Sequence, residues 1–97
     1  MVKLIWSPKA IADLEEICDY LAQDSEYYAK LFVQRVVALV ERIGEFPKAG
    51  RIVPEYQRED LRERIFQSYR IVYLVKHDVV EIVAIVHGAR LLPELEE

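Results

Sequence analysis

The amino-acid sequence predicts an α+β domain in which a helical hairpin packs on one face of an antiparallel sheet. A short β-prone segment comes first, and two segments with helical periodicity follow it across a short link. Three apolar, β-prone runs then complete the order β-α-α-β-β-β. Strands that follow one another across tight turns pair antiparallel, and 97 residues suit one domain, which we take as residues 1–97.

The first half of the chain carries the helix signals. "VKLIW" at residues 2–6 predicts a strand, and Ser7 followed by Pro8 predicts a helix start. Apolar residues at helical spacing extend this helix to about residue 23. Asp24 or Ser25 is the next candidate cap, and a second helix is expected over residues 26–44, ending at Gly44.

The second half carries the strand signals. A connection at residues 45–60 leads to the runs "LRERIF", "YRIVYLVK" and "VVEIVAIVHGAR". A two-residue turn at His77 and Asp78 would join the last two runs. Because side chains alternate faces along a strand, we expect an uncharged face against the helices. Its members are Tyr69, Ile71, Tyr73, Val75, Val80, Ile82, Ala84 and Val86.

The opposite face of this hairpin is mixed. It would carry Arg70, Val72, Leu74, Lys76, Glu81, Val83, Ile85 and His87. Arg70 and His87 become diagonal neighbours, roughly 7–8 Å apart by ordinary sheet geometry. Two helices cannot cover both faces of a sheet. We therefore expect a partner to cover the aliphatic patch of Val72, Leu74, Val83 and Ile85.

Charge and composition exclude several function classes. A net charge of −4 argues against a generic nucleic-acid binder, although residues 48–90 hold eight basic and six acidic side chains. The chain has no apolar run that spans a membrane and no signal-peptide pattern, so a cytoplasmic location is expected. Two histidines and one distant cysteine do not make a metal site, and no cofactor motif is present.

Four segments, taken together, resemble a known family. "WSPKAIADLEEICDYL", "FPKAGRIVPE", "LRERIFQSYRIVYLV" and "VVEIVAIVHGAR" resemble the RelE/ParE superfamily of type II toxins over residues 4–92. The resemblance implies a small α+β toxin that a co-produced antitoxin neutralises. That antitoxin would account for the aliphatic patch, and Arg90 is assigned to the same interface.

The resemblance also implies site residues. In the RelE-like branch, which cuts mRNA on the ribosome without metal, Arg70 matches the arginine at the scissile phosphate. Glu55 and His87 fall close to a glutamate and a late histidine of the YoeB-like nucleases. Cleavage of RNA needs a base, an acid and cations on the phosphate. Glu55 would be the base, His87 the acid, and Arg70 with Arg64 the phosphate clamp.

Three of these residues also have a simpler, structural interpretation. Glu55 suits a solvated loop, His87 a structural strand end, and Arg70 an ion pair with Glu81 or with an antitoxin carboxylate. The turn at residues 67–68 decides the place of Arg64. Two turn residues would direct Arg62 and Arg64 toward the helices, whereas three would bring Arg64 beside Arg70.

Two activities follow from the two branches. The residues above favour ribosome-dependent cleavage of mRNA by a slight margin. The alternative is a ParE-like, non-enzymatic inhibitor of DNA gyrase. The helical hairpin and "VHGAR" resemble this ParE-like branch. The chain also has no tyrosine after Tyr73, whereas both nuclease patterns place one near the C-terminus. A decayed member that only binds its antitoxin is the third possibility.

Overall fold

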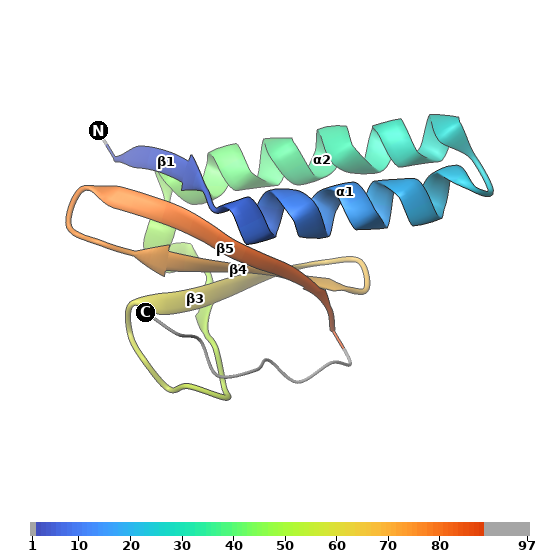
Figure 1. Cartoon of the computed structure of the whole chain (residues 1–97). Coiled ribbons are helices and arrows are strands. Elements are labelled where there is room, and N and C mark those ends of the chain that lie inside the picture. Colours follow the sequence, from blue (N-terminus) through green and yellow to red (C-terminus); the bar gives the residue numbers. More distant parts are fainter. Residues whose placement is uncertain (1, 89–97) are drawn as a thin grey trace.

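The fold is a layer of two helices on one face of a five-stranded sheet (Figure 1). A computed structural model describes residues 2–88. The helices are α1 (Pro8–Ala22), α2 (Glu26–Glu45) and the 3₁₀ turn η1 (Pro47–Ala49). The strands are β1 (Lys3–Trp6), β2 (Arg51–Ile52), β3 (Leu61–Phe66), β4 (Tyr69–Val75) and β5 (Val79–His87). The predicted fold class is confirmed.

The two long helices begin at the expected caps. The Ser7 hydroxyl accepts a hydrogen bond from the backbone N–H of Ala10, and Ser25 does the same for Tyr28. The predicted end of α2 at Gly44 is wrong, because the helix continues to Glu45 and Phe46 caps it. Gly44 lies instead where α2 packs on Leu4 of β1, with that side chain 3.8 Å from where a Cβ would stand.

The sheet has the strand order β1-β5-β4-β3-β2. Strands β2 to β5 pair antiparallel, as expected for consecutive strands, whereas β1 pairs parallel with β5. The sheet is therefore mixed. After β1 the helical hairpin crosses the sheet to the far edge at β2, and the next three strands lead back until β5 lies beside β1 (Figure 1). The predicted connection at residues 45–60 contains η1 and the short edge strand β2.

The main core lies between the helices and the sheet. Phe32, Val36 and Ile43 of α2 are almost completely buried against Tyr73 and Ile82. The ring of Phe32 also contacts the rings of Phe66 and Tyr69 at centroid distances of 5.5 and 5.4 Å. Burial of such side chains is the principal driving force for folding. No helix within residues 2–88 is long and apolar enough to cross a membrane.

A β-bulge in β5 changes the second half of the last hairpin. The predicted turn is confirmed, because the N–H of Lys76 donates to the carbonyl of Val79 and Leu74 pairs with Glu81. After Tyr73 and Ile82 the register shifts by one residue, so Val72 pairs with Ala84 rather than with Val83. Each later residue of β5 consequently takes the face opposite to the one that simple alternation predicts.

The bulge corrects four predicted positions. Ile85 and His87 lie on the helix-covered face, opposite Ile71 and Tyr69. Ala84 and Val86 lie on the other face, which we call the second face, together with Val72 and Arg70.

The chain covers much of the second face itself. Val53, which follows β2, is fully buried there with Leu61 and Val72, and Tyr56 packs on the same cluster. The segment between β2 and β3 lies on the side of the sheet away from the helices (Figure 1). The expectation that two helices leave this face uncovered is therefore wrong at its centre, because a loop supplied the missing apolar side chains.

Candidate functional site: a buried arginine between two carboxylates

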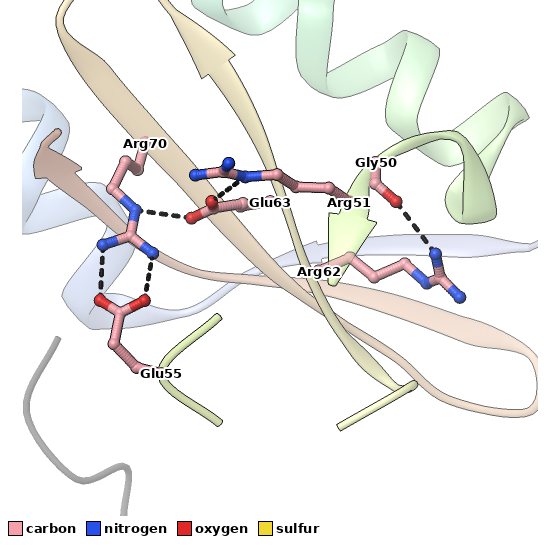
Figure 2. A network of polar contacts seen from close by, with 6 residues as sticks. All are labelled: Gly50, Arg51, Glu55, Arg62, Glu63 and Arg70. Atoms are coloured by element: carbon pink, nitrogen blue, oxygen red, sulfur yellow. Dashed lines mark hydrogen bonds and ion pairs between the residues drawn. The ribbon is translucent and has the colours of Figure 1, made fainter. Parts of the chain in front are cut away.

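Arg70 lies on the second face with its guanidinium held by two glutamates. Glu55 takes both terminal nitrogens, at 2.6 and 2.7 Å, in a bidentate pair. Glu63 accepts from Nε at 2.6 Å. Figure 2 shows the guanidinium of Arg70 with one carboxylate against each of these edges. The planar fork of arginine matches a carboxylate in this bidentate geometry.

The local structure explains why the three side chains meet. Glu63 and Arg70 come from neighbouring strands, where the pairs Glu63–Val72 and Ile65–Arg70 make them diagonal neighbours on one face. Glu55 comes from the turn after β2, which Val53 anchors in the second-face cluster. Two adjacent strands and one anchored turn therefore place the network.

Burial sets the electrostatics of this network. The side chain of Arg70 is 6% exposed, that of Glu63 is fully buried, and that of Glu55 is 20% exposed. The hydrogen bonds that Arg70 donates to Glu55, and secondarily the one to Glu63, raise the pKa of Arg70 above its already high usual value, against the opposing effect of burial. Arg51 adds a second cation on Glu63, with Nε 2.5 Å from Oε2. The four charges balance.

His87 does not join Arg70. It pairs with Tyr69 at the end of the sheet, and its ring meets that of Tyr69 edge to face at 5.7 Å between centroids. This places His87 on the helix-covered side, so the prediction that His87 and Arg70 are diagonal neighbours on one face is wrong. The cause is the bulge, which sequence alternation does not reveal.

Arg64 also lies away from Arg70. Phe66 pairs with Tyr69, so Gln67 and Ser68 form a two-residue turn in which Gln67 has a φ of 54°. Arg64 then pairs with Ile71 and lies on the helix side of the sheet. Of the two alternatives for this turn, the structure has the one that separates Arg64 from Arg70. Of the predicted clamp, base and acid, it brings together only Arg70 and Glu55.

The predicted antitoxin-binding residues have mixed positions. Val72 is 1% exposed, Leu74 and Val83 are half-buried on the second face, and Ile85 lies in the helix-side core. Arg90 lies outside the described residues. The aliphatic patch therefore shrinks to Leu74 and Val83 as surfaces that a partner could touch.

Sequence reasoning missed Glu63, the most buried member of the network. A two-residue turn at residues 67–68 places Glu63 diagonal to Arg70, so the signal was present in one of the two registers. In "LRERIF" the glutamate stands between two arginines, a pattern that is typical of an exposed edge strand. The sequence therefore did not indicate that Glu63 is buried.

A second polar cluster fixes the segment beside the network. The Tyr73 hydroxyl donates to the carbonyl of Pro47 at 2.6 Å and accepts from the N–H of Gly50 at 3.1 Å. Burial raises the pKa of Tyr73, which the hydrogen bond from Gly50 partly opposes. Arg62 donates to the carbonyls of Gly50 and Glu59, both at 3.0 Å. Arg62 thus holds the backbone at Gly50, as Figure 2 shows, and at Glu59.

The arrangement can hold a loop in place and neutralise its own charges. Three of the five N–H groups of the Arg70 guanidinium donate to Glu55 and Glu63, so a substrate phosphate would meet two carboxylates at this cation. Within residues 2–88 no three histidine, cysteine, aspartate or glutamate side chains are placed to hold a metal ion.

Comparisons with known proteins agree on one family. The family model described as the ParE toxin of the type II toxin–antitoxin system parDE matches residues 4–92. "Toxin RelE2" of Caulobacter vibrioides is 34% identical over 94% of this chain and 100% of its own length. "Putative toxin Y4kP" of Sinorhizobium fredii is 27% identical over 96% of this chain and 95% of its own.

Solved structures show the same fold. The chromosomal ParDE toxin–antitoxin system of P. aeruginosa contains a chain that is 26% identical, with a TM-score of 0.75 over 90% of this chain and 96% of that one. The conserved protein HP0894 of Helicobacter pylori, 21% identical, matches with a TM-score of 0.57 over 95% of this chain and 100% of its own. This chain belongs to the ParE toxin family of type II toxin–antitoxin systems, within the RelE/ParE superfamily.

Proposed function

We propose that this toxin stops growth by binding a large target, DNA gyrase, and not by cutting RNA. This is the ParE-like alternative of the sequence analysis. The observation that carries it is the state of Arg70, whose three guanidinium nitrogens all donate to Glu55 or Glu63. A toxin that acts by binding needs only a stable fold and a complementary surface.

The charges around Arg70 weigh against a phosphate clamp. An incoming phosphate would meet two carboxylates beside the arginine, and like charges at this range repel strongly in a low dielectric. General acid–base cleavage also needs its groups within hydrogen-bond reach of one reacting phosphate. Arg64 and His87, the other predicted cation and the predicted acid, lie on the opposite face of the sheet.

We further propose an antitoxin as the physiological partner. The family match and the ParDE relative, which is part of a toxin–antitoxin system, support it. Leu74 and Val83 on the second face remain candidate contacts, because both side chains are half-buried and apolar. Gyrase works in the cytoplasm, so we place the toxin there.

The test compares two readouts with one purified protein. We expect inhibition of gyrase supercoiling and trapped DNA breaks at toxin concentrations that leave ribosome-bound mRNA intact. Cleavage of mRNA in a cell-free translation mixture, with gyrase unaffected, would overturn the proposal. Such a result would favour the second candidate, mRNA cleavage, which the name of the 34% identical relative "Toxin RelE2" supports.

A paired substitution separates folding from chemistry. Glu63→Gln with Arg70→Met removes the buried charges together and retains most of their volume, and such replacements of buried pairs are often tolerated. We expect the doubly substituted toxin to fold and to inhibit gyrase as the wild type does. A folded variant without toxicity would show that Arg70 acts directly on a target.

A further inference from the structure

A small pocket lies between α1 and the ends of β4 and β5, on the helix side of the sheet. Its volume is about 220 Å³. Sites for drug-sized ligands usually have roughly 300 Å³ or more, so this one suits a single side chain. The polar and aromatic residues that line it come from one face of α1 and from the two strand ends. They are Lys9, Asp13, Glu16, Tyr20, Tyr69 and His87.

Of the two carboxylates in the pocket, one pairs with a lysine and the other does not. Lys9 forms an ion pair with Asp13, with Nζ 2.9 Å from Oδ2. The same oxygen of Asp13 accepts from the N–H of Ile85 at 2.9 Å. Glu16 is exposed one helical turn further along and has no ion pair with any residue between 2 and 88. The pocket therefore has a net negative charge at Glu16.

Aromatic rings form the other walls. Tyr69 is half-buried and meets the ring of His87 edge to face. Tyr20, four residues after Glu16, is 66% exposed, so its ring contributes little to the core. Aromatic faces and a free carboxylate together suit a planar cation, because a guanidinium stacks on a ring and donates to carboxylate oxygens.

We propose that this pocket binds an arginine side chain of a partner protein. The surrounding surface supports a basic partner, since residues 7–45 carry eight acidic and four basic side chains. Exposed tyrosines such as Tyr20 are also enriched at protein interfaces. The proposal does not depend on whether the toxin acts on gyrase or on mRNA, because it concerns only what the pocket accepts.

The experiment follows backbone amide signals of the whole chain by NMR during titration with small probes. N-acetyl-arginine methylamide is expected to shift the amides of Tyr69, Ile85 and His87. N-acetyl-citrulline methylamide has the same shape without the charge. We expect it to bind roughly fivefold more weakly or worse, which is the factor that an ion pair and a cation–π contact supply.

Substitutions on the exposed face of α1 provide matched controls. Glu16→Gln and Tyr20→Ala should each weaken arginine binding, whereas Glu15→Gln removes an exposed charge outside the pocket and should not. Both Glu15 and Glu16 are exposed, so the two charge variants should fold equally well. Equal binding of the arginine and citrulline probes, or equal loss in Glu15→Gln and Glu16→Gln, would overturn the proposal.

Discussion

Arg70 joins the carboxylates of Glu55 and Glu63 through one guanidinium. In the sequence it stands out as a cation in an apolar strand, and the resemblance gives it a phosphate to hold. In the fold it lies between Glu55 and Glu63 with 6% of its side chain exposed. Buried ion pairs of this kind tolerate joint replacement far better than the loss of one partner.

The first prediction concerns the stability that depends on Arg70. Arg70→Ala leaves the fully buried Glu63 with Arg51 as its only cation among residues 2–88 and breaks the bidentate ion pair of Glu55 with Arg70. We expect a loss of about 3–5 kcal/mol in the free energy of unfolding. Glu63→Gln with Arg70→Met should recover most of it.

Urea denaturation of the two variants and the wild type measures this loss. If Arg70→Ala unfolds at the same urea concentration as the wild type, the network is not structural. Toxicity assays of Arg70→Ala distinguish a chemical role from a folding defect only when this measurement accompanies them.

The second prediction concerns Tyr73 and pH. Because burial raises the pKa of Tyr73 in the folded state, the unfolded chain loses the proton first as pH rises. The free energy of unfolding should therefore fall above about pH 10, the ordinary tyrosine pKa. Tyr73→Phe should remove part of this slope, although it also costs about 1–3 kcal/mol by stranding the N–H of Gly50 and the carbonyl of Pro47.

Urea denaturation between pH 8 and pH 11 tests the second prediction, with Tyr27→Phe as the control. Tyr27 is 79% exposed, so its removal should change neither the stability nor the slope. Parallel slopes for all three proteins would contradict the role assigned to Tyr73.

At the scale of elements, α1 and the bulge in β5 depend on each other. The Ser7 hydroxyl donates to the carbonyl of Val83 at 3.2 Å, and Asp13 accepts from the N–H of Ile85. These contacts bond the backbone of Val83, the extra residue of the bulge, and that of Ile85, two positions later. Unpaired backbone groups are costly when buried, so the start of α1 stabilises the bulge. The bulge in turn places Ile85 in the core and His87 at its edge.

The third prediction follows from that dependence. Asp13→Ala should lower the free energy of unfolding by about 1–3 kcal/mol, because the N–H of Ile85 loses its acceptor. Asp13→Asn retains an acceptor oxygen and should cost less. Hydrogen exchange at the Ile85 amide should accelerate in Asp13→Ala.

Asp19→Ala is the matched control, since Asp19 is an exposed acidic residue of the same helix. Similar stability and similar Ile85 protection in the Asp13 and Asp19 variants would show that the bulge does not need α1.

At the scale of the whole molecule, the two faces of the sheet differ in how they are covered. Helices cover one face, and the chain's own segment from Val53 to Tyr56 covers the centre of the other (Figure 1). Of the predicted aliphatic patch, Leu74 and Val83 then remain as the half-buried side chains that a partner could touch. The family membership shows that this surface belongs to a toxin of a type II toxin–antitoxin system.

Local sequence signals predicted much of the fold. Ser7, Pro8 and Ser25 mark helix starts because capping is decided within one turn, and the turn at His77 and Asp78 follows from the apolar runs on each side. Apolar alternation likewise placed the core positions of β4. Glu55 and Arg70, which the resemblance assigned to one site, do meet, but as an ion pair that the sequence analysis did not predict.

Contacts between distant segments decided the rest. Alternation along β5 could not show the bulge, because the groups that stabilise it come from α1, more than seventy positions away in the chain. That shift separated His87 from Arg70, and a two-residue turn did the same for Arg64. The burial of Arg70 needed Glu63 and an anchored turn. A sequence shows which side chains can bond, whereas packing alone selects the partners that remain after water is excluded.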